Sequence, residues 1–257
     1  MNASSRSEAR SHAQDDDIYV TDTASGTVLK FDLNGNQSVV ASGLNSPAGL
    51  AFDKSGQLYV ANAGSGTVVK FDSSAHQSVF ASGLNNPAGL AFAGIGELYV
   101  ANTGAGTIEK IASTGARSVF ASGLSTVRYL AVHDCGHLYA STLRTIEKFD
   151  STGSKSTIFN TLNDVYGIAF AGGSDLYAGL QNSGSIVKVS AGGGTQIITF
   201  SDPVHAFPAG LAFQHEDKLY VVFGQTIRRY DLSGGDFLFA SGLTDSRHIA
   251  VRTGHHR

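Results

Sequence analysis

The residues of this chain that can do chemistry stand in the loops of a strongly repetitive sequence. The main candidates are Arg128, Tyr129, Asp164, Tyr166, His205, Phe207, Arg247 and His248. A guanidinium group can hold a carboxylate or a phosphate through paired hydrogen bonds. An imidazole can take up a proton near neutral pH, and a phenol can donate to a developing oxyanion. These residue types predict acid–base chemistry on a small anionic or carbonyl-bearing substrate.

Most of these residues occupy two positions at which the copies of the repeat differ. The first position reads Ala48, Ala88, Arg128, Tyr166, Ala209 and Arg247. The second position reads Gly49, Gly89, Tyr129, Gly167, Gly210 and His248. Asp164 and the insertion 201–207, which carries His205 and Phe207, belong to the same loops. Because the altered loops come from neighbouring copies, we expect them to form one contiguous arc over a concave site.

The predicted roles divide this set in two. Catalytic roles go to His248, His205, Tyr166 and Tyr129, and substrate-binding roles go to Arg128, Arg247, Asp164 and Phe207. His248 is the main candidate for the base, because it stands beside a cation where other copies carry Gly. Its pKa should therefore be lowered, and its replacement by Ala should leave the fold intact. The structural alternative is that Arg128–Asp164 and Arg247–Asp245 are ion pairs and that the aromatic side chains fill a widened channel.

The elements that position these loops follow from a repeated phrase of an apolar residue, Tyr and a small residue. The tyrosines of the six copies are Tyr19, Tyr59, Tyr99, Tyr139, Tyr177 and Tyr220, so the phrase returns every 38 to 43 residues. A repeat of this length with only strand and turn patterns is typical of a β-propeller. One copy, residues 47–82, reads as four strands, from an innermost one over 49–52 to an outermost one over 77–81.

The two ends of the repeat series predict how the ring closes. The chain opens on a second strand at Ile18 and ends just after an innermost strand, Ile249–Val251. The C-terminal strand should complete the N-terminal blade, which leaves no free sheet edge. We therefore expect an all-β, single six-bladed propeller over residues 15–252, with four antiparallel strands per blade. A disordered polar tail over 1–14 and a polar tail over 253–257 should flank it.

The segment from Asn45 to Asn62, NSPAGLAFDKSGQLYVAN, resembles the NHL repeat and its six-bladed relatives. Those relatives include the virginiamycin B lyase-like and the gluconolactonase/strictosidine synthase-like propellers. The lactonases hold a divalent metal through a Glu near the N-terminus, and this chain has no such Glu near Ile18. The synthases need a Glu at the mouth of the channel, which the altered loops do not supply. The resemblance to the lyases implies ester opening by elimination with a His and Mg²⁺, for which His205 or His248 could be the base.

The sequence thus favours a small-molecule enzyme of lyase or cyclase type. A non-enzymatic NHL-type propeller that binds a peptide or protein across the same face is the alternative. We predict no required cofactor and no metal ligand, although the lyase resemblance leaves room for a divalent cation such as Mg²⁺.

Charge and composition limit the kinds of partner that the protein can bind. The net charge is −3, and no apolar run approaches the ~18 residues of a membrane helix, so we predict no nucleic acid and no membrane partner. We expect a monomer with a small-molecule substrate. Residues 1–14 lack the apolar stretch of a secretory signal, so we expect a cytoplasmic protein by default and a secreted one if a signal peptide was removed.

Three further patterns read as structural. The turn His133–His137 carries the only cysteine, Cys135, but lies on the face opposite the arc, and we interpret it as a solvated turn. Polar residues after the second strands, which we interpret as turn caps, are Asp22, Asn62 and Asn102. Glu109 and Glu147 lie in third strands, where we expect them to face outward.

Overall fold

The computed structural model describes residues 16–72, 74–94, 96–172, 175–181, 183–190, 194–198, 207–215 and 217–252. Strands dominate these residues, joined by two 3-10 helices, η1 (Ala63–Ser65) and η2 (Thr103–Ala105). Within these ranges no helix is long and apolar enough to cross a membrane. The predicted tails over 1–14 and 253–257, and the predicted site residue His205, lie outside the described residues.

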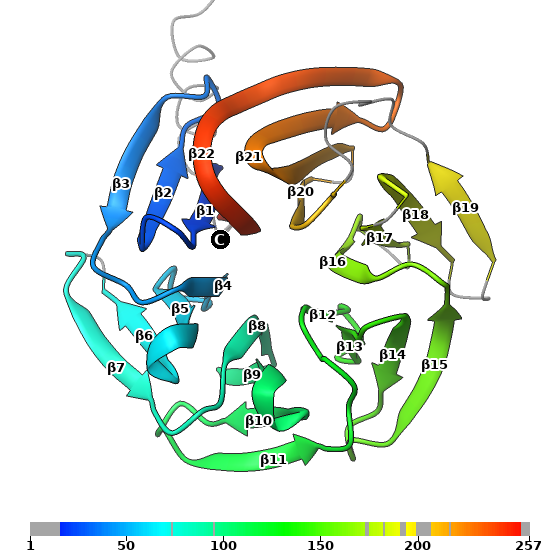
Figure 1. Ribbon diagram of the computed structural model, residues 1–257. Helices are drawn as coiled ribbons and strands as arrows, with labels where there is room; N and C mark the ends of the chain where they lie inside the picture. The colour runs from blue at the N-terminus through cyan, green and yellow to red at the C-terminus, as the bar shows by residue number, and fades with distance from the viewer. Residues whose placement is uncertain are drawn as a thin grey trace, which may run out of the picture.

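The strands form five antiparallel sheets arranged around a ring (Figure 1). Four sheets have four strands each. The first is β4 (Pro47–Phe52), β5 (Leu58–Asn62), β6 (Thr67–Phe71) and β7 (Gln77–Ala81). The second is β8 (Pro87–Ala93), β9 (Glu97–Asn102), β10 (Thr107–Ile111) and β11 (Arg117–Ala121). The third is β12 (Leu130–Val132), β13 (Leu138–Ser141), β14 (Thr145–Phe149) and β15 (Lys155–Asn160). The fourth is β16 (Val165–Phe170), β17 (Leu176–Leu180), β18 (Ser185–Val189) and β19 (Thr195–Ile198).

The fifth sheet has six strands in the order β20-β21-β22-β1-β2-β3. Its members are β1 (Asp17–Asp22), β2 (Thr27–Phe31), β3 (Gln37–Ala41), β20 (Leu211–Gln214), β21 (Lys218–Asp231) and β22 (Gly235–Arg252). The all-β propeller with four-stranded antiparallel blades is confirmed, but the predicted count of six separate blades is wrong, because the described chain has five sheets.

The long strand β22 causes this difference. Its first part pairs with β21 and its last part pairs with β1, and Ser246 is paired with both. In other copies the chain turns sharply at this point, where Ser46 and Asn86 have positive φ and a proline follows. Asp245 has no positive φ, and Ser246 replaces the proline, so the strand continues and joins the two ends of the repeat series in one sheet.

The predicted closure of the ring is confirmed. Residues Ile249, Ala250 and Val251 of β22 pair antiparallel with Val20, Tyr19 and Ile18 of β1. The C-terminal strand therefore lies at the innermost position of the sheet that continues through β1, β2 and β3 (Figure 1).

Four of the six repeated tyrosines, Tyr19, Tyr59, Tyr139 and Tyr177, pack against the phenylalanine of the next innermost strand. Tyr59 of β5 lies edge-on to Phe92 of β8, with 4.9 Å between ring centroids, and Tyr19 lies in the same way against Phe52 at 4.8 Å. Offset and edge-on aromatic pairs stabilise beyond the area that they bury. In these copies the Tyr and the Phe of the following innermost strand thus form one contact, which explains why both recur.

Glu109 and Glu147 do not face outward as predicted. Both are buried, with 6% and 5% exposure. The carboxylate of Glu147 accepts hydrogen bonds from Thr145 and Thr157, at 2.7 and 2.9 Å, and Glu109 accepts one from Thr107 at 3.1 Å. These hydroxyl groups donate hydrogen bonds to the buried carboxylates and so compensate their burial. The prediction was wrong because it took the charge of a side chain alone as a sign of exposure.

Candidate functional site

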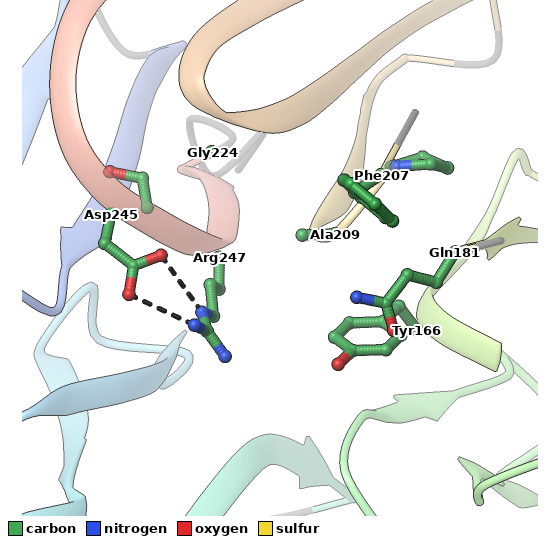
Figure 2. Close-up of a pocket in the computed structure, with 9 residues that line it drawn as sticks. Tyr166, Gln181, Phe207, Ala209, Gly224, Asp245 and Arg247 are labelled. Carbon is green, nitrogen blue, oxygen red and sulfur yellow. Dashed lines mark hydrogen bonds and ion pairs between the residues drawn. The ribbon is translucent and has the colours of Figure 1, made fainter. Parts of the chain in front are cut away.

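The loops that lead into the innermost strands meet at one end of the ring, which we call the mouth face. A pocket of about 210 Å³ opens there (Figure 2). Its lining comes from β16, the residue after β17, the residues before β20, and the long strands β21 and β22. The lining residues are Tyr166, Gln181, Phe207, Pro208, Ala209, Gly224, Asp245, Ser246 and Arg247. Three predicted site residues, Tyr166, Phe207 and Arg247, therefore share one pocket.

Arg247 supplies the positive charge of the pocket. Its Nε and Nη2 donate to the two carboxylate oxygens of Asp245, at 3.1 and 3.2 Å. The hydrogen bond to Asp245 raises the pKa of Arg247 against the opposing effect of burial, so the guanidinium group stays positively charged. The side chain is still 53% exposed, and its remaining nitrogen has no hydrogen-bond partner among the described residues (Figure 2). This nitrogen is available to an anionic ligand.

Arg128 lies behind the pocket rather than in its wall. Its guanidinium sits over the ring of Tyr166, 4.6 Å from the centroid, and its Nη1 is 3.9 Å from a carboxylate oxygen of Asp164. That nitrogen is buried and has no hydrogen-bond partner in the described chain. A cation over an aromatic face is attractive, so Arg128 fixes the ring that the pocket uses.

Tyr129 and His248 meet across the central channel. The innermost strands follow one another around the ring in chain order, and these two residues belong to the third and the sixth, on opposite sides. Their rings stack with 4.3 Å between centroids and 22° between planes. The Tyr129 hydroxyl donates to the backbone oxygen of Arg247 at 2.9 Å. The pair plugs the channel, leaving a cavity of about 70 Å³ beside it.

The other four copies have glycine at the position of Tyr129 and His248, and there is no room for a Cβ at any of them: Gly49, Gly89, Gly167 and Gly210. A Cβ on Gly49 would clash with the backbone oxygen of Ala88, and a Cβ on Gly210 would clash with that of Arg247. The innermost strands are thus packed backbone to backbone at four of the six positions. The Tyr129–His248 stack fills the space that this close packing leaves at the centre.

The predicted lowering of the His248 pKa is confirmed. Burial, with a smaller contribution from the neighbouring charge of Arg247, lowers the pKa of His248 to about 3. Burial also raises the pKa of Tyr129. Both rings are therefore neutral over the physiological range. A base works best when its pKa is near the working pH, so an imidazole with this pKa is a weak proton acceptor at pH 7.

The polar residues after the second strands are structural, but the prediction that they cap the turns after them is wrong for Asn62 and Asn102, whose side chains make no cap hydrogen bond to η1 and η2. The side-chain oxygens of Asn62 and Asn102 accept hydrogen bonds from the backbone N–H groups of Asn45 and Asn85, both at 2.7 Å. Asp22 does the same for the backbone N–H groups of Thr244 and Asp245, at 2.7 and 3.2 Å, and also accepts from the Thr244 hydroxyl. In each case the side chain holds a loop that leads to the mouth face.

Asp22 gives a prediction for stability. Asp22→Ala should lower the free energy of unfolding by about 1–3 kcal/mol, because two backbone N–H groups lose their acceptor. Asp22→Asn is the matched control and should lose less stability, because its single amide oxygen can still accept the Thr244 N–H, as Asn62 and Asn102 do for the equivalent loops. Urea denaturation at pH 7 measures both variants. An alanine variant as stable as wild type would contradict the role of Asp22 as a hydrogen-bond acceptor.

The same residue predicts a pH dependence. Burial opposes ionisation of Asp22, but the hydrogen bonds from Thr244 and Asp245 outweigh it and lower its pKa. A carboxyl group with a lowered folded pKa stabilises fully above its unfolded pKa, about 3.9, and loses that contribution as the pH falls through the folded value. Below pH 4 the wild type should therefore lose this stability, while Asp22→Asn should not.

Two lining residues, Gln181 and Ser246, were missed by sequence reasoning. Gln181 follows β17 and donates its backbone N–H to the backbone oxygen of Asp164 at 2.9 Å, which places its side chain beside the pocket. Ser246 is fully buried, and its hydroxyl oxygen has no partner among the described residues. The signal for Gln181 lay one position beyond the polar residues that follow the second strands, where other copies carry Ala63 and Thr103. The catalytic roles assigned to the predicted residues stay predictions.

Comparisons with known proteins agree with this fold. Residues 44–71 match the profile of the NHL repeat. The sequence has no significant match among curated proteins. A solved nidogen/laminin complex contains a chain with a TM-score of 0.83 and 15% identity, and the match covers 92% of this chain and 98% of that one.

Two enzymes of known structure share the fold at lower similarity. Virginiamycin B lyase from Staphylococcus aureus has a TM-score of 0.70 and 11% identity, over 86% of this chain and 79% of that chain. A gluconolactonase from Xanthomonas campestris has a TM-score of 0.72 and 15% identity, over 92% of this chain and 88% of that chain. At these identities the likeness concerns the fold alone. The chain is thus a β-propeller that contains an NHL repeat and is built like the virginiamycin B lyase-like structures.

Proposed function

We propose that the protein is a small-molecule enzyme of lyase or cyclase type that acts in the mouth-face pocket on an anionic, carbonyl-bearing substrate. The observation that carries this proposal is the convergence of three polar groups on one small space. Figure 2 shows the Arg247 guanidinium facing that space from one side, with the Tyr166 hydroxyl and the Gln181 amide on the other. Few, well-placed polar groups among apolar walls are typical of small-molecule sites.

The chemistry follows from the side chains in place. Arg247 binds the carboxylate or enolate-forming carbonyl of the substrate, since Asp245 uses only two of its three nitrogens. Tyr166 donates a hydrogen bond to the oxygen on which negative charge develops. Phe207 and Pro208 provide the apolar wall. His248 is too weak a base for this reaction at neutral pH. The proton acceptor that we propose is therefore His205, which lies two residues before Phe207 in the sequence.

Removal of the Arg247 cation is the direct test. Arg247→Ala should weaken binding of a small carboxylate by about 1.5–3 kcal/mol, which is roughly 10- to 150-fold in Kd. Isothermal titration with a panel such as pyruvate, 4-hydroxybenzoate and gluconate measures this loss. The matched control is Lys54→Ala, which removes a cation on the opposite face and should change nothing. If some carboxylate binds the wild type and equal affinity survives in Arg247→Ala, the anionic-substrate assignment is wrong.

The reaction type has its own readout. A lyase or cyclase gives products with the same total mass as the substrate, whereas a hydrolase adds the mass of one water. Mass spectrometry on a panel of lactones and cyclic esters therefore separates the two. Incorporation of water into every product formed would exclude the proposed reaction class.

A second candidate is a binding module for a peptide or protein, and the exposed apolar residues of the mouth face favour it. Leu162 is 85% exposed and Phe207 is 54% exposed, on the loops that lead into β16 and β20. A peptide partner would bury both side chains. In that case Leu162→Ser and Phe207→Ser should abolish association, while Arg247→Ala should have little effect.

A further inference from the structure

The second concave surface of the molecule lies at the other end of the channel. The innermost strands run away from the mouth face, so the turns that follow them gather at the opposite face. These turns surround a cavity of about 980 Å³, lined among others by Asp53, Lys54, His133, Cys135 and Arg252. Cys135 is an exposed free thiol.

Two imidazoles flank this thiol. The Cys135 Sγ is 2.8 Å from Nδ1 of His133 and 2.8 Å from Nδ1 of His137. The backbone N–H of Cys135 donates to Nδ1 of His133 at 3.1 Å. Because the single lone pair of this nitrogen is already used, His133 must be an acceptor there. His137 is then free to take the thiol proton.

Comparison with an unaltered turn separates the structural role from the chemical one. In the turn that follows β4, Asp53 accepts a hydrogen bond from the backbone N–H of Ser55 at 2.9 Å, as His133 does from Cys135. His133 thus replaces Asp53 in holding the turn. His137 stands where the other copy has Gln57, whose side chain is not needed for that cap. The thiol stands where Ser55 donates its hydroxyl to Asp53 at 2.7 Å, and the imidazole of His137 beside the thiol has no counterpart in that turn.

We propose that Cys135 is a nucleophilic thiol that exchanges with small-molecule disulfides reaching this cavity, and that His137 is its base. The thiol proton passes to Nδ1 of His137 as the sulfur attacks one sulfur of the disulfide. A new S–S bond forms to Cys135, and the S–S bond of the reagent breaks. The leaving thiolate takes the proton from His137, so the products are a mixed disulfide and one free thiol.

The geometry of this turn favours a free thiol at Cys135 over a metal-binding site. A metal ion at this turn would have to displace the backbone N–H that already occupies Nδ1 of His133. In the described part of the chain, no group of three or more His, Cys, Asp or Glu residues is arranged to hold a metal ion.

The experiment uses the full chain, reduced, treated with EDTA and exchanged into metal-free buffer at pH 7. Hydroxyethyl disulfide is the reagent, and mass spectrometry follows the adduct on Cys135. We expect the folded protein to react about tenfold faster than the same chain unfolded in urea, and His137→Gln to remove that advantage. His76→Gln is the matched control, an exposed histidine of another turn, and should react like wild type.

Three results would overturn the proposal. The first is that the folded chain reacts no faster than the unfolded chain, a comparison that requires no variant. The His137→Gln variant, with an unchanged circular dichroism spectrum, could react at the wild-type rate. Protein not treated with EDTA could carry one equivalent of zinc and react only after chelation, which would make the turn a metal site. None of these outcomes depends on ligand binding at the mouth face.

Discussion

A chain that lacks residues 245–257 should aggregate or lose most of its thermal stability. The deletion removes the part of β22 that pairs with β1 from Asp17 to Asp22. It also removes Ile249, which is buried in the core cluster with Ile18 and Val20. The loss uncovers the edge of β1, and an unpaired edge strand is a template for association with other chains. The strand β22 joins the two ends of the repeat series in one sheet, so its loss removes the main-chain pairing that closes the ring.

Size-exclusion chromatography and a thermal melt measure this effect. The matched control is a chain that lacks only residues 253–257, which follow the last paired residue, Arg252. The control should elute and melt like the full chain. A monomeric 1–244 chain with the full-length Tm would show that the β1–β22 pairing does not hold the ring.

The propeller could be predicted because its sequence signals are local and repeated. In four copies the tyrosine of the second strand contacts the phenylalanine of the following innermost strand, as Tyr59 and Phe92 do. Such a contact repeats at the period of the copies and is therefore visible in the sequence. The positions of the altered loops could be predicted for the same reason. Tyr166 and Arg247 occupy equivalent places in the fourth and sixth copies, and Phe207 stands two residues before the equivalent Ala209 of the copy between them.

Three features could not be predicted from the sequence. They depend on contacts between side chains that are distant in the sequence, or on a strand that continues where other copies turn. The stack of Tyr129 on His248 joins opposite sides of the channel, and nothing in a linear pattern gives the direction of two side chains there. The fusion of two copies in one sheet depends on the backbone at Asp245 remaining extended. The burial of Glu147 depends on hydroxyl groups from its own and the neighbouring strand. Each of these requires the fold before the residue can be interpreted.

His248 illustrates the consequence for function. Its type and its place beside Arg247 predicted a catalytic base, and its lowered pKa agreed with that prediction in sign. The size of the pKa shift argues against a catalytic base, because the same burial that keeps the ring neutral also makes it a poor proton acceptor. The expectation that His248→Ala leaves the fold intact is not supported by the geometry, since the ring is only 9% exposed and stacks on Tyr129.

We therefore expect His248→Ala to lower the free energy of unfolding by about 2–4 kcal/mol, as for other large-to-small changes in a core. The variant enlarges the cavity of about 70 Å³ at the centre of the ring and leaves Tyr129 without its partner. His248→Phe is the informative control, because it keeps a ring for the stack and removes both nitrogens. Its stability should stay within about 1.5 kcal/mol of wild type. Urea denaturation of both variants measures the difference.

The same pair of variants decides the role of His248 in catalysis once a substrate is in hand. If the ring only closes the channel, His248→Phe should bind the carboxylate at Arg247 with unchanged affinity and turn over the substrate at the wild-type rate. Tyr166→Phe should instead slow turnover with little change in stability, because its hydroxyl group faces the pocket (Figure 2). A His248→Phe protein that folds and binds normally but has lost all turnover would return the base to His248. Its pKa in the substrate complex would then have to lie well above the value near 3 that burial imposes on the free protein.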